Sequence, residues 1–135
     1  MDFSVADELG VTWERQDIPD IDLLWMRVHR MWLGADGKVF PGAFKNRPSD
    51  KDGMSTDWQK YATPEQTRNR AKTPKDNAVI QFVVGAVRKV ADQTVVHTPD
   101  RATNNRAHTD VYGEKHTEAR LQLSRIYTPV ISVEP

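Results

Sequence analysis

The segment from residue 97 to residue 110 gathers side chains that can exchange protons. It holds two of the four histidines, His97 and His108, together with two Asn, two Arg and two Asp residues. Imidazoles titrate near neutrality, so two of them can serve a phosphate ester as general base and general acid. We therefore predict His97 and His108 as catalytic residues.

Arginine and amide side chains supply the matching binding groups. A guanidinium holds a phosphate through two parallel hydrogen bonds, so Arg27 and Arg106 are predicted anion contacts. Asn104 and Asn105 are predicted to orient the ligand. Four further residues are candidates for ligand contact: His29, Ser55, Asp110 and Lys115.

A purely structural interpretation competes for the same segment. Asn, Asp and Thr are common in loops because their side chains hydrogen-bond the neighbouring backbone. His97 follows a short apolar run and fits a half-buried position at a strand end. The sequence is thus equally consistent with only one of the two histidines having a chemical role.

No metal and no other cofactor is predicted. The chain has no cysteine, which excludes disulfides, thiolate nucleophiles and Cys-based zinc sites. His97, His108 and Asp110 could supply three ligands, but they lack the His-x-x-x-His spacing that a helix would preorganise.

Residues 23–34, LLWMRVHRMWLG, must position Arg27 and His29. As a strand, this segment places both side chains on one face; a helix is the alternative, because its apolar residues also share a helical stripe. Asp36-Gly37 favours the strand, since Asp-Gly is typical of hairpin turns. The partner strand is then expected at 38–44, bent by Pro41-Gly42.

The remaining elements predict the fold. Thr63, Pro64 and Gln66 form a capping box that starts a helix at 64–72, and Thr117 is expected to cap a helix over 117–126. Strands are predicted at AVIQFVV, as a central strand, at 93–97 and at 128–133, with polar loops at 45–57 and 98–110. The fold class is α+β: a single domain with a mostly antiparallel or mixed sheet of about five strands and two short helices.

Charge divides the chain at residue 22. Residues 1–22 carry seven acids and one base, a net charge of −6, whereas residues 23–135 carry 18 bases and 12 acids, a net charge of +6. An acidic arm over 1–22 is expected to cover a basic surface, to bind a protein partner or to stay solvated, and the basic body over 23–135 favours an anionic ligand.

The segment 60–75 carries five basic residues against Glu65, with Trp58 and Tyr61 beside it. Basic and aromatic side chains together suit contact with RNA, because they bind phosphates and stack on bases. The same pattern describes a solvated helix face, and the pI near 6.9 does not favour nucleic acid.

The order of elements is similar to that of ADP-ribosyltransferase-like domains. The similarity rests on Arg27 in an early strand, Ser55-Thr56 in MSTDW, the 64–72 helix and the AVIQFVV strand. It implies that Arg27 contacts the nicotinamide dinucleotide and that the Ser-Thr strand shapes the pocket. A Glu-x-Glu pair does not follow; Glu114 and Glu118 are the late acidic candidates.

The leading hypothesis is a small domain that handles a phosphate-bearing ligand, a nucleotide or RNA, with histidine acid–base chemistry. The alternatives are a non-catalytic interaction module that uses the acidic arm and aromatic surface, and an ADP-ribosyltransferase-like NAD-binding domain. Enzyme status is left open. The N-terminus has no basic start or apolar run, and no apolar stretch could span a bilayer, so we expect a soluble cytoplasmic protein without membrane contact.

Overall fold

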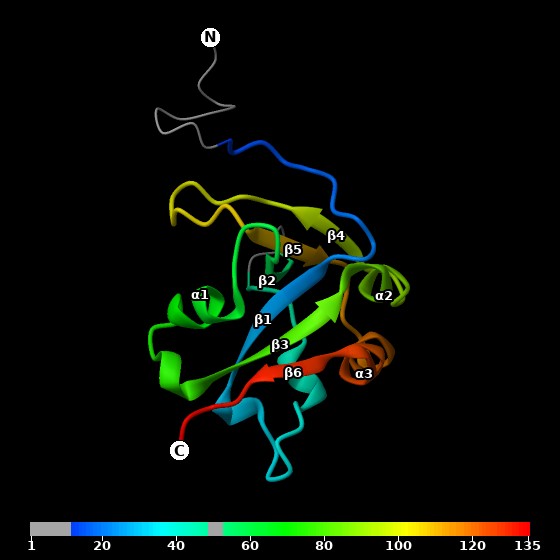
Figure 1. The fold of residues 1–135 in the computed structure, drawn as a ribbon. Helices are drawn as coiled ribbons and strands as arrows, with labels where there is room; N and C mark the ends of the chain where they lie inside the picture. Colours follow the sequence, from blue (N-terminus) through cyan, green and yellow to red (C-terminus); the bar gives the residue numbers. More distant parts are fainter. Residues whose placement is uncertain (1–11, 49–52) are drawn as a thin grey trace.

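Six strands form one antiparallel sheet in a computed structural model of the chain, which describes residues 12–48 and 53–135. The order across the sheet is β4-β5-β2-β1-β3-β6, so β1 and β2 lie at the centre and β4 and β6 at the edges (Figure 1). The strands are β1 (Leu23–His29), β2 (Met54–Trp58), β3 (Asn77–Val83), β4 (Thr94–His97), β5 (His108–Tyr112) and β6 (Thr128–Ile131).

Helices cover both faces of the sheet. The α-helices are α1 (Pro64–Asn69), α2 (Val84–Arg88) and α3 (Thr117–Ile126), and short 3-10 turns are η1 (Arg30–Trp32), η2 (Pro41–Ala43) and η3 (Pro74–Asp76). The longest has ten residues, so none within the described ranges reaches the length of about 20 that a membrane-spanning helix needs.

Side chains alternate along the strands and give the sheet two different faces. In β1, Leu24, Met26 and Val28 point into the main hydrophobic cluster, and we call this side the core face. Arg27 and its neighbours Trp25 and His29 point to the opposite side, which we call the cleft face. The strand predicted within residues 23–34 is therefore confirmed over Leu23–His29, and the helix alternative is wrong.

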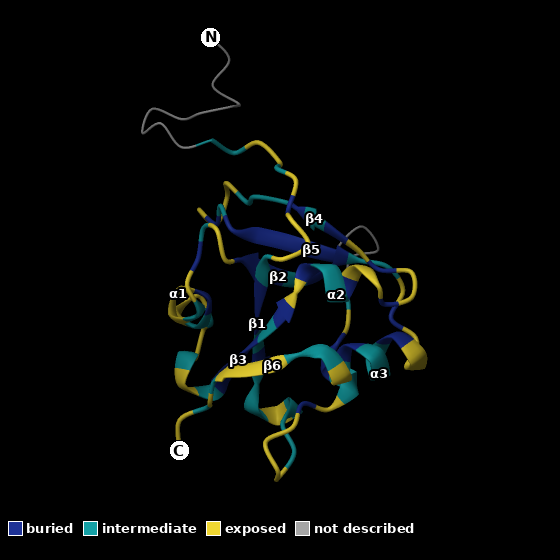
Figure 2. Ribbon diagram, turned by 45° about the vertical axis from the view of Figure 1, so that its right-hand side comes forward, coloured by how far each residue is buried: buried dark blue, intermediate teal, exposed yellow. Residues whose placement is uncertain are grey.

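Packing against the core face comes from α2 and α3. Their buried side chains join the cluster of the core face: Val84, Val87, Ala119 and Leu123. On the cleft face, α1 lies against β1 and β3 beside a smaller apolar cluster that includes Trp25 and Val79. Figure 2 shows β1 and β5 as buried strands and β6 as an exposed edge. The polar side chains near α1 are thus held by a rigid central sheet.

The capping box predicted for α1 is present. The Thr63 hydroxyl accepts a hydrogen bond from the backbone N–H of Gln66, and the Gln66 side chain accepts one from the backbone N–H of Thr63. Thr117, by contrast, is the first residue of α3, and His116 occupies the N-cap position without a side-chain hydrogen bond.

The predicted partner strand at 38–44 is wrong. The Asp36-Gly37 turn forms, with Gly37 at a φ of +81°, but pairing stops at one bridge between Leu33 and Val39. Pro41 then starts the turn η2, because its ring fixes φ and removes the N–H that a ladder requires.

Two predicted loops contain strands instead. Residues 54–57 and 108–110 belong to β2 and β5, and α2 begins at Val84, where an extended strand was expected. These corrections raise the strand number from about five to six and the α-helix number from two to three. The α+β, single-sheet fold class is confirmed.

The second half of the acidic segment is bound to the body. Ile18 is 4% exposed and belongs to the main core, and its carbonyl oxygen accepts from Arg88 Nη1 at 2.8 Å. Asp22 accepts from the indole N–H of Trp58 at 2.9 Å. A partner contact through residues 1–22 stays a prediction, and residues 1–11 lie outside the described residues.

Candidate functional site

A cleft of about 740 Å³ opens on the cleft face, bounded by the central strands, α1 and the segment 43–48. Five of the predicted site residues line it: Arg27, His29, Ser55, Asn105 and His108. The other five do not: His97, Asn104, Arg106, Asp110 and Lys115. A volume of this size is typical of sites for small organic ligands.

Arg27 forms part of the cleft wall on β1. Its Nη1 donates to the carbonyl oxygen of Thr67 at 2.9 Å, and no carboxylate of the described ranges lies within ion-pair distance of its guanidinium. Desolvation lowers the pKa of Arg27, the carboxylate of Asp57 partly offsets this, and the Arg70 cation adds to it. A half-buried cation with one protein partner is a favourable position for an anionic ligand.

Asp57 fixes the wall between β2 and α1. Its carboxylate is 4% exposed and accepts from Asn105 Nδ2 at 2.8 Å and from the Thr67 hydroxyl at 2.7 Å. Asn105 therefore has a positioning role, because its amide joins the loop before β5 to β2. This network ties three separate segments around the cleft.

His108 and Ser55 face each other across the β2–β5 pair. Ser55 Oγ lies 2.9 Å from His108 Nε2. On the other side of the ring, Nδ1 lies 3.1 Å from the carbonyl oxygen of Thr98, which can only accept. We therefore assign the hydrogen to Nδ1 and the lone pair to Nε2, and this lone pair can take the Ser55 proton.

Thr98 connects His108 to a buried carboxylate. Its hydroxyl lies 3.0 Å from His108 Nδ1 and donates to Asp110 Oδ2 at 2.9 Å. Asp110 Oδ2 itself lies 4.0 Å from Nδ1, and Oδ1 accepts from Arg47 Nη2 at 2.8 Å. Asp110 thus stands behind the cleft wall, joined to His108 through the Thr98 hydroxyl.

Close contact between β2 and β5 sets the distance from Ser55 to His108. Gly53 immediately precedes β2 and packs against β5, and a Cβ built on it would lie 2.6 Å from the carbonyl oxygen of Val111. Any larger residue there would push the two strands apart.

His97 lies away from the cleft, on the core face, with its ring 5.1 Å from that of Trp58. Nδ1 accepts from the backbone N–H of Gln16 at 3.0 Å, and Nε2 donates to the carbonyl oxygen of Arg106 at 2.7 Å. Desolvation is the main cause that lowers the pKa of His97, although its hydrogen bond to Arg106 opposes it. The two predicted catalytic imidazoles therefore do not face a common site.

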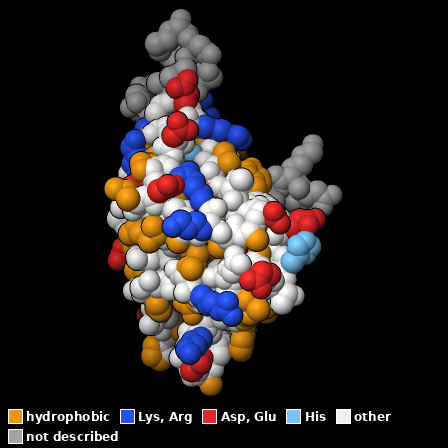
Figure 3. All heavy atoms as spheres, turned by 90° about the vertical axis from the view of Figure 1, so that its right-hand side faces the viewer, with side chains coloured by type: hydrophobic (Ala, Val, Ile, Leu, Met, Phe, Trp, Pro, Cys, Tyr) orange, Lys and Arg blue, Asp and Glu red, His pale blue; other side chains and the backbone are white. Residues whose placement is uncertain are grey.

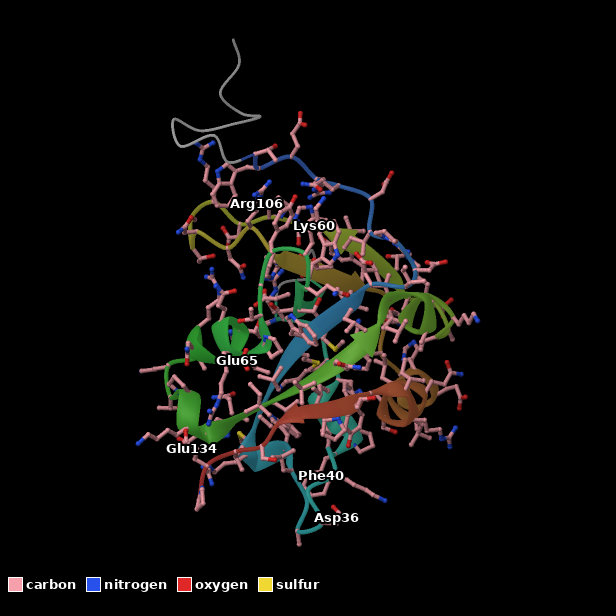
Figure 4. The ribbon with its side chains drawn as sticks, in the orientation of Figure 1. Asp36, Phe40, Lys60, Glu65, Arg106 and Glu134 are labelled. Carbon is pink, nitrogen blue, oxygen red and sulfur yellow. The ribbon has the colours of Figure 1, made fainter. Side chains whose placement is uncertain are left out.

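Arg106 belongs to a stack beside the N-terminal segment. Its guanidinium lies 3.9 Å from the ring centroid of Tyr61, and Lys60 lies 5.3 Å from the same ring. Figure 4 labels Arg106 and Lys60 side by side at this end of the molecule. Gln16 Nε2 donates to the Tyr61 hydroxyl at 2.6 Å, so the stack fastens the N-terminal segment at Gln16.

Lys115 is an internal clamp. Its ammonium donates to the carbonyl oxygens of Val111 and Gly113, both at 2.9 Å, and to the side chain of Asn46. Desolvation lowers the pKa of Lys115 to about 8, with Asp110 opposing the shift. The clamp holds the segment before β2 against β5.

Two other predicted contacts have local structural roles. His29 Nδ1 accepts from the backbone N–H of Met31 at 3.1 Å and caps η1, although the ring also lines the cleft. Asn104 is exposed at a φ of +54°, in the left-handed region that Asn tolerates, and its carbonyl oxygen accepts from Arg70 Nη2.

Alternation in two short segments could have revealed the residues that were missed. In MSTDW, Met54, Thr56 and Trp58 point to the core while Asp57 joins Ser55 on the cleft face. HTDVY repeats the pattern in β5. The roles of Thr67, Thr98 and Arg47 depend on contacts between distant segments and carry no such signal.

Surface charge differs between the two sides of the molecule. Figure 3 views the side of α2 and α3, where basic and acidic side chains are interspersed. Among the described residues, the cleft lining contains four basic side chains, Arg27, Lys45, Arg47 and Arg70, and two acidic ones, Asp57 and Asp100. In the part of the chain that the structure describes, no group of three or more His, Asp or Glu residues is arranged to hold a metal ion.

Comparison of the chain with protein-family models, with curated proteins and with solved structures finds no match in any of the three. The residues and their geometry therefore carry the functional argument.

Proposed function

We propose that the domain binds a phosphate-bearing ligand, a nucleotide or a short RNA, in the cleft on the α1 side of the sheet. Arg27 contacts the phosphate, and His108 acts as the acid–base group beside it. The observation that carries the proposal is the half-buried Arg27 guanidinium, which has a single hydrogen bond to protein and no ion pair among the described residues.

Burial of an arginine without a carboxylate at ion-pair distance is unfavourable unless an anion compensates for the lost hydration, and Asp57 offsets only part of this cost. Thr67 satisfies one of the five N–H groups of Arg27, and none of the others is among the buried atoms without a partner, which is consistent with their access to the cleft. A phosphate accepts two such hydrogen bonds at once, so it fits this position better than a neutral ligand would.

The composition of the lining supports a nucleotide in particular. Trp25 and Trp32 contribute aromatic surface to the cleft, and among the described lining residues the basic ones outnumber the acidic ones. Lys45 lies 4.8 Å from the ring centroid of Trp32, which places a cation and an aromatic ring together at the rim. Such pairs suit a base and the phosphate attached to it.

An NAD-binding function has one observation of its own. The resemblance to ADP-ribosyltransferase-like domains implies a pocket built from Arg27 and the Ser55 strand, and both residues line the same cleft. NAD therefore belongs in the ligand panel. The non-catalytic interaction module stays a prediction that depends on residues 1–22. A pull-down that compares the full chain with a variant lacking residues 1–11 would test it, because a partner bound through this segment should be lost from the shortened variant.

Calorimetric titration with AMP, NAD and a short RNA tests the proposal. Arg27→Met keeps the length of the side chain and removes its charge, and we expect it to weaken binding at least about 10-fold, or about 1.4 kcal/mol. Arg125→Met is the matched control, because it removes the same charge from an exposed position on α3.

Equal affinity in the Arg27→Met and Arg125→Met variants would contradict the proposed phosphate contact. Failure of all three ligands to bind the unmodified protein would contradict the proposed function itself.

A further inference from the structure

We infer that Ser55 is a nucleophile, activated by His108, that attacks a phosphodiester in the cleft and carries its phosphoryl group covalently. This inference rests on the proposed function for the ligand class. It starts from the 2.9 Å contact between Ser55 Oγ and His108 Nε2, which is the distance that a nucleophile and its general base require.

Ser55 differs from the other hydroxyls nearby in what its oxygen contacts. Thr56 is 2% exposed and donates to the carbonyl oxygen of Thr109 at 2.8 Å, and the Thr98 hydroxyl donates to Asp110. Among the described residues, the hydrogen-bond partner of the Ser55 hydroxyl is an imidazole nitrogen, and Ser55 lines the open cleft. It is therefore the hydroxyl that has both a base and access to a ligand.

The groups behind His108 stabilise the imidazolium that proton transfer creates. Nδ1–H points at the carbonyl oxygen of Thr98, which fixes the ring, and the Asp110 carboxylate lies 4.0 Å from Nδ1. Arg47 Nη1 lies 3.5 Å from Nε2, but the positive charge of Arg47 is balanced by its ion pair with Asp110 at 2.8 Å. Nucleophile, base and orienting group form the arrangement of a catalytic triad with Thr98 inserted.

The first half of the reaction transfers the phosphoryl group to the protein. Ser55 Oγ forms a bond to phosphorus while the bond from phosphorus to the leaving oxygen breaks. The Ser55 proton passes to His108 Nε2 and then to the leaving oxygen, which departs as an alcohol. The Arg27 guanidinium, on the same cleft wall, is placed to balance the charge on the non-bridging oxygens.

The second half restores the serine. Water attacks phosphorus and gives a proton to His108 Nε2, the bond from phosphorus to Oγ breaks, and the proton returns to Ser55. One phosphodiester and one water give one phosphomonoester and one alcohol, so no further reactant is needed.

Covalent labelling with diisopropyl fluorophosphate tests the nucleophile, because this probe phosphorylates an activated serine and releases fluoride. We expect a single label on Ser55, read by intact-mass analysis and peptide mapping. His108→Gln keeps a polar side chain opposite Ser55 and should slow labelling by about 100-fold, the size of a lost general base. Ser55→Ala should abolish the label.

Ser124→Ala is the matched control, since Ser124 Oγ donates to the Leu121 carbonyl oxygen within α3, outside the cleft lining. It should label like the unmodified protein. Absence of a label on Ser55, or equal labelling rates with and without His108, would overturn the inference. Thermal unfolding of each variant verifies that it is folded.

Hydrolysis of bis(4-nitrophenyl) phosphate tests the substrate class. Release of nitrophenolate by the unmodified protein and its absence in Ser55→Ala would support a phosphodiester substrate. If Ser55 is labelled but no nitrophenolate is released, the phosphodiester class is wrong. The ligand titrations separate the two proposals. Nucleotide binding that depends on Arg27 without any label on Ser55 contradicts the nucleophile alone, whereas a labelled Ser55 in a protein that binds no nucleotide contradicts the proposed ligand alone.

Discussion

The two histidines at either end of the 97–108 segment have similar burial and opposite surroundings. His97, on the core face, contacts two backbone groups, the N–H of Gln16 and the carbonyl oxygen of Arg106. His108, on the cleft face, contacts the hydroxyl of Ser55 on one side and both oxygens of Thr98 on the other. Backbone partners hold an imidazole in one state, whereas a hydroxyl in an open cleft can exchange its proton.

The partners also select different tautomers. His97 donates from Nε2, because a carbonyl oxygen faces that atom, and His108 donates from Nδ1 for the same reason. Residue type and burial would not separate these two side chains. Their function is decided by which nitrogen carries the lone pair and by the group that this lone pair faces.

The largest expected effect is on stability. His97→Ala should lower the free energy of unfolding by about 3 kcal/mol, because it leaves a cavity against Trp58 and removes the partners of two backbone groups. His108→Ala should lower it by only about 1 kcal/mol, because the space joins the cleft and admits water. Urea unfolding measures both values. Equal losses in the free energy of unfolding would show that the two histidines contribute equally to stability.

Lys115 extends the comparison to a buried cation. Lys115→Met keeps the aliphatic stem and removes the donor to three oxygen atoms, and we expect a loss of about 2 kcal/mol in urea unfolding. Lys38→Met, at an exposed position in the Asp36-Gly37 turn, is the control and should change stability by less than about 0.5 kcal/mol. An unchanged free energy of unfolding in Lys115→Met would mean that the cost of burying the ammonium equals the stabilisation from its three hydrogen bonds.

The pH dependence of stability isolates His97. Its pKa is lowered in the folded protein, so between about pH 6.5 and the folded pKa the unfolded chain binds the additional proton. Stability therefore falls as the pH falls through this window, by up to about 1.4 kcal/mol per pH unit for one proton. Urea unfolding across this window should reveal this slope and its loss in His97→Phe. An unchanged slope in that variant would assign it to another group.

The smallest effect is spectroscopic and involves no loss of stability. Long-range ¹H–¹⁵N correlation spectra distinguish the tautomers of neutral histidine. We expect the Nε2–H form for His97 and the Nδ1–H form for His108. An Nε2–H form at His108 would leave Ser55 without a base and would contradict the nucleophile.

Local sequence patterns predicted those parts of the fold that depend on local interactions. Thr63 and Gln66 lie three residues apart, so the capping box could be recognised directly. The first strand and AVIQFVV were predicted from their alternation and apolar content, and Asp36-Gly37 from its turn chemistry. Polar residues in β2 and β5 hid these strands, because the side chains that face the cleft are the same types that form loops.

The site was only partly accessible from the sequence. Arg27, Ser55 and His108 were each recognised as candidates, and all three line the cleft. Their grouping depends on the β2–β5 register, which pairs Ser55 with Asp110 and Asp57 with His108. Proximity in the sequence suggested instead that His97 and His108 act together. Strand alternation decides otherwise, because His97 pairs with Thr109 and shares its face rather than that of His108.

The close approach at Gly53 gives the cleft an unexpected point of mutational sensitivity. A residue without a side chain, and without any contact to a ligand, controls how near β5 can come to Ser55. In a saturation-mutagenesis screen, Gly53 should therefore tolerate as few substitutions as the residues that meet the ligand. The space between β2 and β5 limits which residues position 53 accepts. Substitution of Gly53 is therefore the first change to make in a design that enlarges the cleft.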